Sequence, residues 1–277
     1  MPFAEASDGI RLYFEEHGAG EPLLLLAGQG QDHRQWDLVR DAYAARHRVI
    51  VYDYRGLGRS DAPSEPPYTT RGQAEDAVAV LDHLGIERAH VFGVSMGGRV
   101  AQWLGIDHGA RLGALVLGCT TPGDRHGIPR TAEVQQVLER TLASDEPPEG
   151  AAVLALLSLM FSPGWVNANI EVVQAMAAQR ADPVPEFVRR WHFQASQAHD
   201  AWELLPTITA PTLVLHGSDD QVSPSANARL LAGRVPGAEL QLVEGGRHGF
   251  FLEFGEETAR LALGFLGSHP LGDAHTA

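Results

Sequence analysis

The sequence predicts an α/β fold, namely a doubly wound, mostly parallel sheet of eight strands with an inserted helical cap. Short β-rich runs alternate along the chain with segments of helix length. The strand candidates are continuous apolar runs, which are typical of parallel strands covered by helices on both faces. This alternation stops between Pro122 and Pro206, where several helical segments follow one another without a strand candidate.

The chain opens with a predicted β-hairpin, because the β-rich runs 3–6 and 10–16 flank the turn signal Asp8-Gly9. Helical patterns separate the later strands, most clearly at 71–85 and 224–235. The six further strands are predicted at residues 23–27, 48–53, 89–94, 114–118, 212–217 and 239–244.

The interruption of the strand pattern also predicts the domain organisation. Two short stretches at 144–150 and 181–186 read as turns between the helices of the cap. Aromatic and methionine side chains gather in the cap, namely Met160, Phe161, Trp165, Met176, Trp191, Phe193 and Trp202. The predicted units are a sheet domain of residues 1–122 and 206–268, a helical cap of residues 123–205, and a flexible tail of residues 269–277.

The composition excludes several classes of function. The 277 residues carry a net charge of −14, and an acidic protein repels the phosphate backbone of nucleic acids. All 21 basic residues are arginine, so the chain has no lysine for a Schiff base or a phosphate-binding loop. Cys119 is the single cysteine, which excludes an internal disulfide and a cysteine-based zinc cluster.

The distribution of apolar residues favours a cytoplasmic protein. The first residues lack the basic segment and apolar run of a signal peptide. The longest apolar run, residues 151–161, is too short to cross a bilayer. We therefore expect no membrane partner and no nucleic-acid partner, and a homodimer is left open.

A candidate nucleophile lies in the segment Gly93-Val94-Ser95-Met96-Gly97, which has the pattern G-x-S-x-G. The segment ends a predicted strand and begins a predicted helix, and this is the context of a nucleophile elbow. In such a turn the serine is strained, and the flanking positions have room for little more than hydrogen. The alternative is an ordinary glycine-rich turn between a strand and a helix.

A serine hydroxyl needs a base, and His248 is the best candidate because it follows the last predicted strand in a glycine-flanked loop. His216 is a minor candidate that we expect to lie in the core. The histidine in turn needs a carboxylate to fix its tautomer, and the loop after residue 217 offers both Asp219 and Asp220. One of the two aspartates is expected to be a turn or helix-cap residue.

With these motifs, residues 8–268 resemble the α/β-hydrolase family. The segment 53–63 is similar to the family's D-x-R-G-x-G-x-S loop, and the family's G-x-x-D pattern aligns Gly217 with Asp220, which favours Asp220 over Asp219. Within the family the chain looks most like 3-oxoadipate enol-lactonases, aclacinomycin methylesterase-type enzymes and small bacterial carboxylesterases. Its opening segment is also similar to cofactor-free haloperoxidases and perhydrolases.

The chain departs from the family at the loop that would form the oxyanion hole. The family usually carries His-Gly there, whereas this chain has Ala27-Gly28-Gln29. Because an oxyanion hole uses backbone N–H groups, we expect Gln29 and Met96 to supply its two donors. The missing imidazole leaves the support of this loop open. The side chain of Gln29 would either contact substrate or point into the loop.

These residues together predict a serine hydrolase that cleaves a carboxylic ester or lactone with Ser95, His248 and Asp220, and without a metal or cofactor. The alternatives are carbon–carbon bond hydrolysis, a lyase-like biosynthetic step, or perhydrolase or haloperoxidase activity on the same three residues. The alternative that is not an enzyme is a ligand receptor, which would bind a small molecule without turnover.

The expected partner is a small, moderately apolar ester or lactone. Candidate substrate contacts are Gly28, Phe161, Trp165 and Trp191, although the aromatic residues would equally pack the cap's own core. An arginine of the cap region would serve as a carboxylate clamp unless it lies on the solvated surface. The candidates for this role are Arg125, Arg130, Arg180, Arg189 and Arg190.

Overall fold

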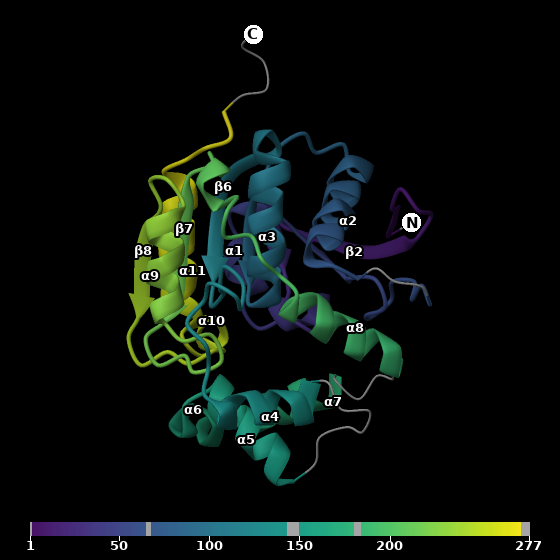
Figure 1. Cartoon of the computed structure of the whole chain (residues 1–277). Coiled ribbons are helices and arrows are strands. Elements are labelled where there is room, and N and C mark those ends of the chain that lie inside the picture. The colour runs from purple at the N-terminus through teal and green to yellow at the C-terminus, as the bar shows by residue number, and fades with distance from the viewer. Residues whose placement is uncertain (1, 65–67, 143–149, 180–183, 273–277) are drawn as a thin grey trace.

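The structure, a computed structural model, describes residues 2–64, 68–142, 150–179 and 184–272. It contains one eight-stranded sheet in the order β1-β2-β4-β3-β5-β6-β7-β8 (Figure 1). The pairs β1–β2 and β2–β4 are antiparallel and all other neighbours are parallel. The strands are β1 (Phe3–Glu5), β2 (Arg11–His17), β3 (Glu21–Leu26), β4 (His47–Tyr52), β5 (Ala89–Val94), β6 (Leu112–Gly118), β7 (Thr212–Gly217) and β8 (Glu239–Val243). The predicted fold class is therefore confirmed.

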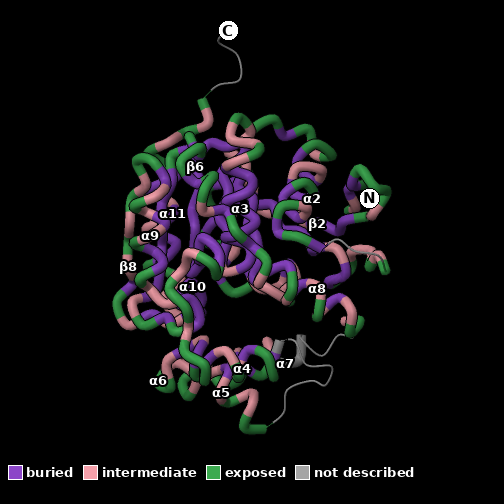
Figure 2. The backbone as a smooth tube through the Cα atoms, viewed as in Figure 1, coloured by how far each residue is buried: buried purple, intermediate pink, exposed green. Residues whose placement is uncertain are grey.

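Helices cover both faces of this sheet, which explains why its central strands are apolar throughout. Leu24 and Leu26 of β3 pack in one core with residues of α2 and α3, whereas Leu23 and Leu25 pack in a second core with residues of α11. Buried backbone accordingly fills the centre of the molecule in Figure 2. The helices of this part are α1 (Arg40–Ala44), α2 (Thr70–His83), α3 (Met96–Asp107), α9 (Ala226–Arg234), α10 (Phe250–Glu253) and α11 (Gly255–Gly267), with short 3₁₀ turns at His33–Trp36, Gly109–Arg111 and Leu205–Thr207.

The strand β8 differs from the other parallel strands because it lies at the edge of the sheet. Its residues alternate between exposed and partly buried, and only Val243 is fully covered. The apolar residues of 239–244 predicted a strand that is buried on both faces. In the structure most of this strand is exposed or partly buried, since an edge strand has only one strand neighbour.

Among the described residues, five helices lie between β6 and β7, and Figure 1 shows α4 to α7 grouped beyond one end of the strands. Val134 and Leu138 of α4 pack with Leu156 and Leu159 of α5 and with Val222 of the sheet domain in a small separate core. By contrast, α8 packs on the main core through residues such as Val188. These helices are α4 (Ala132–Leu142), α5 (Ala151–Met160), α6 (Pro163–Ala168), α7 (Ile170–Gln179) and α8 (Glu186–Gln197).

Residues 143–149, 180–183 and 273–277 lie outside the described residues. They include parts of the two predicted turns, 144–150 and 181–186, and of the predicted tail, 269–277. The segment before residues 273–277 is attached to the sheet domain, because the N–H of Leu271 donates to Glu21 over 2.8 Å. Among the described helices, none is both long enough and apolar enough to cross a membrane.

Candidate active site

Ser95 lies at the sharp turn between β5 and α3 with φ 54° and ψ −118°, a conformation that costs a non-glycine residue about 1–3 kcal/mol. Its neighbours explain the glycines around it. A Cβ atom on Gly93 would lie 2.2 Å from the carbonyl oxygen of Gly97, and one on Gly97 would lie 2.4 Å from that of Leu26. The close approach of β5, α3 and β3 therefore requires glycine on both sides of Ser95.

The side chain of His248 reaches Ser95 from the loop between β8 and α10. Its Nε2 atom lies 2.9 Å from Oγ of Ser95, and its Nδ1 atom lies 2.8 Å from Oδ2 of Asp220. Because an ionised carboxylate only accepts hydrogen bonds, Nδ1 carries the proton and the lone pair of Nε2 faces the serine hydroxyl. The loop is also fixed to α5, since the N–H of Gly249 donates to the carbonyl of Met160 over 2.8 Å.

Asp220 is buried and accepts hydrogen bonds on both oxygens. Its Oδ1 atom accepts from the N–H groups of Val222 and Ser223 at 2.8 and 2.9 Å, and Nε2 of His216 lies 3.2 Å from Oδ2. Burial raises the pKa of this carboxyl, but the charge of His248 and the hydrogen bonds from His216 and His248 outweigh it and hold the pKa well below its usual value. The carboxylate is therefore ionised and oriented.

Of the two aspartates that the sequence offered, the structure brings only Asp220 to His248. The side chain of Asp219 is exposed and accepts a hydrogen bond from the hydroxyl of Ser218 at 3.0 Å. His216 is fully buried, as expected, and contacts the carbonyl of Ser223 through Nε2 at 2.7 Å.

The loop after β3 presents a free backbone donor beside Ser95. Gln29 lines the same cavity as Ser95, and Met96 is the first residue of α3, where an N–H has no partner within the helix. In the described part of the chain no acceptor takes the N–H of Gln29 or of Met96. The N–H of Gly28, by contrast, donates to Oε1 of Gln35 over 2.7 Å.

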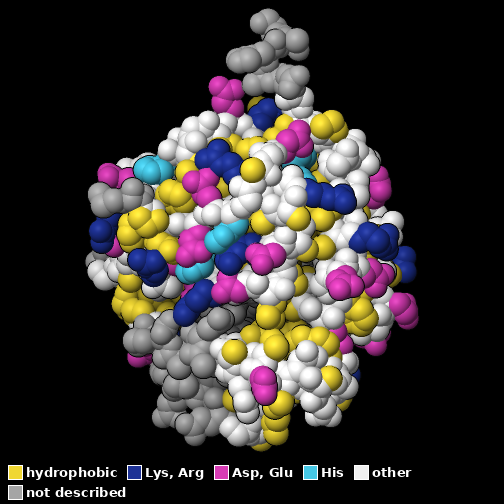
Figure 3. All heavy atoms as spheres, turned by 180° about the vertical axis from the view of Figure 1, so that it is seen from behind, with side chains coloured by type: hydrophobic (Ala, Val, Ile, Leu, Met, Phe, Trp, Pro, Cys, Tyr) yellow, Lys and Arg dark blue, Asp and Glu magenta, His cyan; other side chains and the backbone are white. Residues whose placement is uncertain are grey.

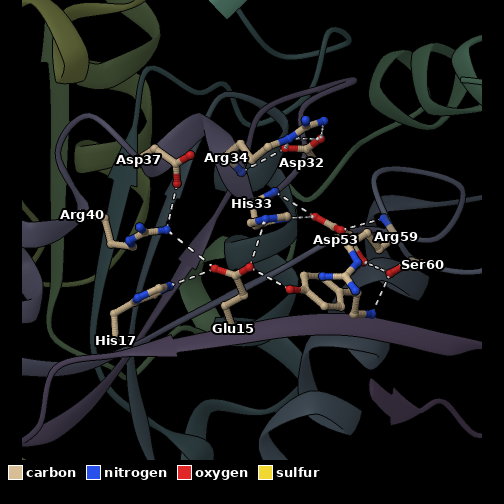
Figure 4. Close-up of polar contacts among 11 residues, drawn as sticks. Glu15, His17, Asp32, His33, Arg34, Asp37, Arg40, Asp53, Arg59 and Ser60 are labelled. Atoms are coloured by element: carbon tan, nitrogen blue, oxygen red, sulfur yellow. Dashed lines mark hydrogen bonds and ion pairs between the residues drawn. The ribbon is translucent and has the colours of Figure 1, made fainter. Parts of the chain in front are cut away.

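Other side chains brace this loop where the chain lacks the usual histidine. The hydroxyl of Tyr54 donates to the carbonyl of Ala27 over 3.0 Å. Behind it, Oδ1 of Asp53 accepts from the N–H and from Nδ1 of His33 at 2.9 and 2.6 Å, and Oδ2 accepts from the N–H of Arg59 at 2.8 Å (Figure 4). The loop is thus braced by hydrogen bonds to Asp53 and Tyr54, which directly follow β4.

The pKa of His33 is raised within this network. Burial lowers it, but the hydrogen bond and charge of Asp53, together with the charge of Glu15, outweigh the burial. Glu15 reaches across from β2, and its Oε1 lies 3.4 Å from Nε2 of His33 (Figure 4).

A cavity of about 70 Å³ opens at Ser95 and His248. Gly28, a predicted substrate contact, also lines this cavity. Its apolar side chains include four that come from the helices between β6 and β7, namely Leu138, Leu156, Met160 and Phe193. Its polar side chains include several that sequence reasoning did not single out, namely Gln31, Gln35, Arg99, Ser196, Gln197 and Ser223.

Three aromatic candidates are not among the residues that line this cavity. Phe161 is buried and stacks on Trp165 with ring centroids 4.5 Å apart. Trp191 packs on Tyr68 with ring centroids 5.1 Å apart. Phe161 and Trp165 pack with the core that includes α11, and Trp191 packs with the core that includes α2 and α3. Other side chains of the inserted helices, among them Phe193, line the cavity instead.

Two groups of described residues have the composition of a metal site, namely Glu21 with His47 and His90, and Asp32 with His33 and Asp53. Neither group lines the cavity at Ser95. Nδ1 of His90 accepts from the N–H of Ala114, so Nε2 carries the proton and has no lone pair for a metal. Hydrogen bonds from His33 and Arg59 already occupy both oxygens of Asp53.

Several known proteins are similar to this chain. The model of the alpha/beta hydrolase fold matches residues 21–254. A protein of Azorhizobium caulinodans named "Putative carbamate hydrolase RutD" is 34% identical over 268 residues, which cover 96% of this chain and 98% of that protein. Est816, described as an N-acyl homoserine lactone degrading enzyme, is 31% identical with a TM-score of 0.80 and covers 95% of this chain and 100% of its own.

The enol-lactonase of Burkholderia xenovorans LB400 has the same fold with a TM-score of 0.83. It is 24% identical and covers 96% of this chain and 100% of its own, so this likeness concerns the fold alone. The family model matches most of the chain, and the Azorhizobium caulinodans relative is 34% identical over 96% of it. These two findings place the sequence in one family. The chain belongs to the α/β-hydrolase fold family of hydrolases.

Proposed function

We propose that this protein is a serine hydrolase that cleaves a carboxylic ester or lactone through an acyl-enzyme intermediate. One observation carries the proposal: Oγ of Ser95 lies 2.9 Å from Nε2 of His248, whose Nδ1 lies 2.8 Å from Asp220. A nucleophile, a base and an orienting carboxylate in hydrogen-bond contact are the arrangement that activates a serine hydroxyl. The same contacts favour an enzyme over a receptor that only binds.

In the proposed reaction, Oγ of Ser95 attacks the substrate carbonyl while its proton moves to Nε2 of His248. The N–H groups of Gln29 and Met96 stabilise the negative charge on the carbonyl oxygen. As the intermediate collapses, the bond to the leaving alcohol breaks and the alcohol takes the proton from His248. Water then attacks the acyl-enzyme and gives a proton to His248, which passes it to Oγ of Ser95 as the acyl bond breaks, so that the acid leaves and the serine hydroxyl is restored. Asp220 stabilises the positive imidazolium in both halves.

A second candidate is the hydrolysis of a carbamate, which the name of the Azorhizobium caulinodans relative favours. The chemistry is closely related, since a carbamate also presents a carbonyl carbon to the nucleophile. The lactone-degrading enzyme at 31% identity supports the ester and lactone reading. We propose further that residues 123–205 act as a cap that supplies the apolar wall of the cavity.

The proposal is tested by treating the protein with a fluorophosphonate and measuring its intact mass. We expect a single adduct that maps to Ser95 and that is lost in Ser95→Ala. Ser223→Ala is the matched control, because Ser223 lines the same cavity but its hydroxyl makes no contact with His248 in the described residues. Labelling that persists in Ser95→Ala, or its absence in an active preparation, overturns the proposal.

A panel of short esters, lactones and carbamates then separates the two candidates. Turnover of esters or lactones that disappears in Ser95→Ala supports the first reading. Turnover confined to carbamates supports the second.

A further inference from the structure

The charge of the cavity at Ser95 is opposite to that of the whole protein. The chain has 35 acidic and 21 basic residues, yet the described residues that line the cavity include Arg99 and Arg130 and no aspartate or glutamate. On the face shown in Figure 3, by contrast, basic and acidic side chains are interspersed. Among the described side chains that line the cavity, the charged ones are thus basic, although the protein as a whole is acidic.

Arg99 already has its partners. It is buried, and its guanidinium donates to the carbonyl of Ser196, to Oγ1 of Thr121 at 2.8 Å and to Oδ1 of Asp124 at 3.0 Å. Its charge is balanced by Asp124, so Arg99 fixes the wall of the cavity.

Arg130 has no such partner. Within the described residues its guanidinium makes no hydrogen bond and no ion pair within 4.0 Å, although the side chain is partly buried. Burial lowers the pKa of Arg130, and the charges of Asp124 and Asp220 act on it only from a distance. A partly desolvated guanidinium without a partner is costly, and an anion that enters the cavity would relieve this cost.

The backbone beside Arg130 is held in place. The N–H of Ile128 donates to Oδ1 of Asn227 over 2.7 Å, and Nδ2 of Asn227 donates back to the carbonyl of Ile128 over 2.9 Å. Asn227 is itself fully buried. The backbone two residues before Arg130 is thus fixed, which lowers the cost of ordering this segment when a ligand binds.

Among the arginines that the sequence offered as a carboxylate clamp, Arg130 alone of those described lines the cavity. Arg125 is exposed, Arg190 pairs with Glu186 at 3.3 Å, and Arg189 donates to the carbonyl of Val184. Arg180 lies outside the described residues.

We propose that Arg130 determines specificity by binding a carboxylate on the substrate, so that the preferred substrate is a short ester or lactone with a negative charge. This inference rests on the proposed function of Ser95. The cavity of about 70 Å³ is roughly half the size of one that holds benzene, which favours a short substrate. The planar guanidinium suits a carboxylate because it donates two parallel hydrogen bonds.

The test compares two esters of nearly equal shape, monoethyl succinate and ethyl levulinate, in which a methyl ketone replaces the carboxylate. Acid release is measured for the wild type, Arg130→Gln and Arg130→Lys. Arg125→Gln is the matched control, since Arg125 is an exposed arginine of the same segment. Melting temperatures show that each variant is folded.

We expect the wild type to prefer monoethyl succinate. Arg130→Gln should lower kcat/KM for this ester by about 10- to 100-fold, which corresponds to the loss of a hydrogen bond to a charged group. The change should lie mainly in KM, with little effect on ethyl levulinate, and Arg130→Lys should restore part of it. Equal losses on both esters, or a wild type that prefers the neutral ester, overturn the inference.

Binding of succinate separates this inference from the proposed function. It is measured by calorimetry in Ser95→Ala, with and without Arg130→Gln or Arg125→Gln. If neither ester is hydrolysed, the proposed function is in question, but weaker succinate binding caused by Arg130→Gln alone still supports the anion site. Equal binding in all three proteins overturns it.

Discussion

Asp220→Asn is expected to lower turnover by several orders of magnitude while the chain stays folded, because one amide cannot replace both oxygens of the carboxylate. Oδ1 of Asp220 accepts from the N–H groups of Val222 and Ser223 at 2.8 and 2.9 Å. Oδ2 accepts from Nδ1 of His248 at 2.8 Å. Asparagine offers one acceptor oxygen and one NH₂ group. The NH₂ group must therefore face either the two backbone N–H groups or the Nδ1–H of His248, and it cannot accept a hydrogen bond from either.

The size of the loss in turnover depends on which of these donors loses its acceptor. If the NH₂ group faced Val222 and Ser223, two buried N–H groups would go unpaired at about 1–3 kcal/mol each. The NH₂ group therefore faces His248, whose proton moves from Nδ1 to Nε2, and Nε2 then cannot accept the proton of Ser95. The expected loss of turnover is on the order of 10⁴-fold, or about 5 kcal/mol, as for a wrong tautomer in other Ser-His-Asp triads.

The assay is the hydrolysis of p-nitrophenyl acetate, with thermal unfolding as the measure of folding. Asp219→Asn is the control, because its side chain is exposed and accepts a hydrogen bond from Ser218, so the change should alter turnover little. Turnover of Asp220→Asn within about tenfold of the wild type would refute the assignment. So would an equal loss in Asp219→Asn.

Three further substitutions test the packing and the loop. Gly93→Ala should lower the free energy of unfolding by about 3 kcal/mol or more in urea, because its Cβ would lie 2.2 Å from the carbonyl oxygen of Gly97; unchanged stability contradicts this. Trp191→Ala should lower stability by about 2 kcal/mol without changing the preferred acyl length, since the ring packs on Tyr68; a shifted preference argues for a place in the cavity. His33 has a folded pKa raised above its unfolded value, so its stabilisation is complete below about pH 6.5 and declines as the pH rises through the folded pKa. The stability difference between wild type and His33→Gln should thus be larger at about pH 5.5 than at about pH 9, and the opposite trend would be inconsistent with the network.

The sequence by itself determined the fold and the place of Ser95, the proposed nucleophile, at the turn after a strand. Continuous apolar runs predict buried parallel strands, and β3 to β7 bear this out, because a strand between two helical layers needs apolar residues on both faces. The glycines around Ser95 were equally informative, since the close approach of three backbones at the turn leaves no room for a Cβ atom at Gly93 or Gly97. Both signals are local, so they can be read without knowing which distant segments meet.

The residues alone left Asp219 and Asp220 open, and only the resemblance to a family favoured one of them. In the structure the choice depends on the turn after β7, which points one side chain to solvent and the next toward His248. The support of the loop at Ala27 was likewise unpredictable, because its braces come from Gln35 and from residues that follow β4. Such contacts join segments that no local pattern relates.

The tertiary structure also decided which side chains face the cavity. An aromatic residue in the inserted helices is predicted equally well to bind substrate or to pack, and Trp165 and Trp191 pack. Arginine is ambiguous in the same way, and the sequence could not separate Arg130 from its neighbours in the cap. Burial and pairing depend on how the helices between β6 and β7 sit on the sheet domain, and that packing is set by long-range contacts rather than by the periodicity of any one segment.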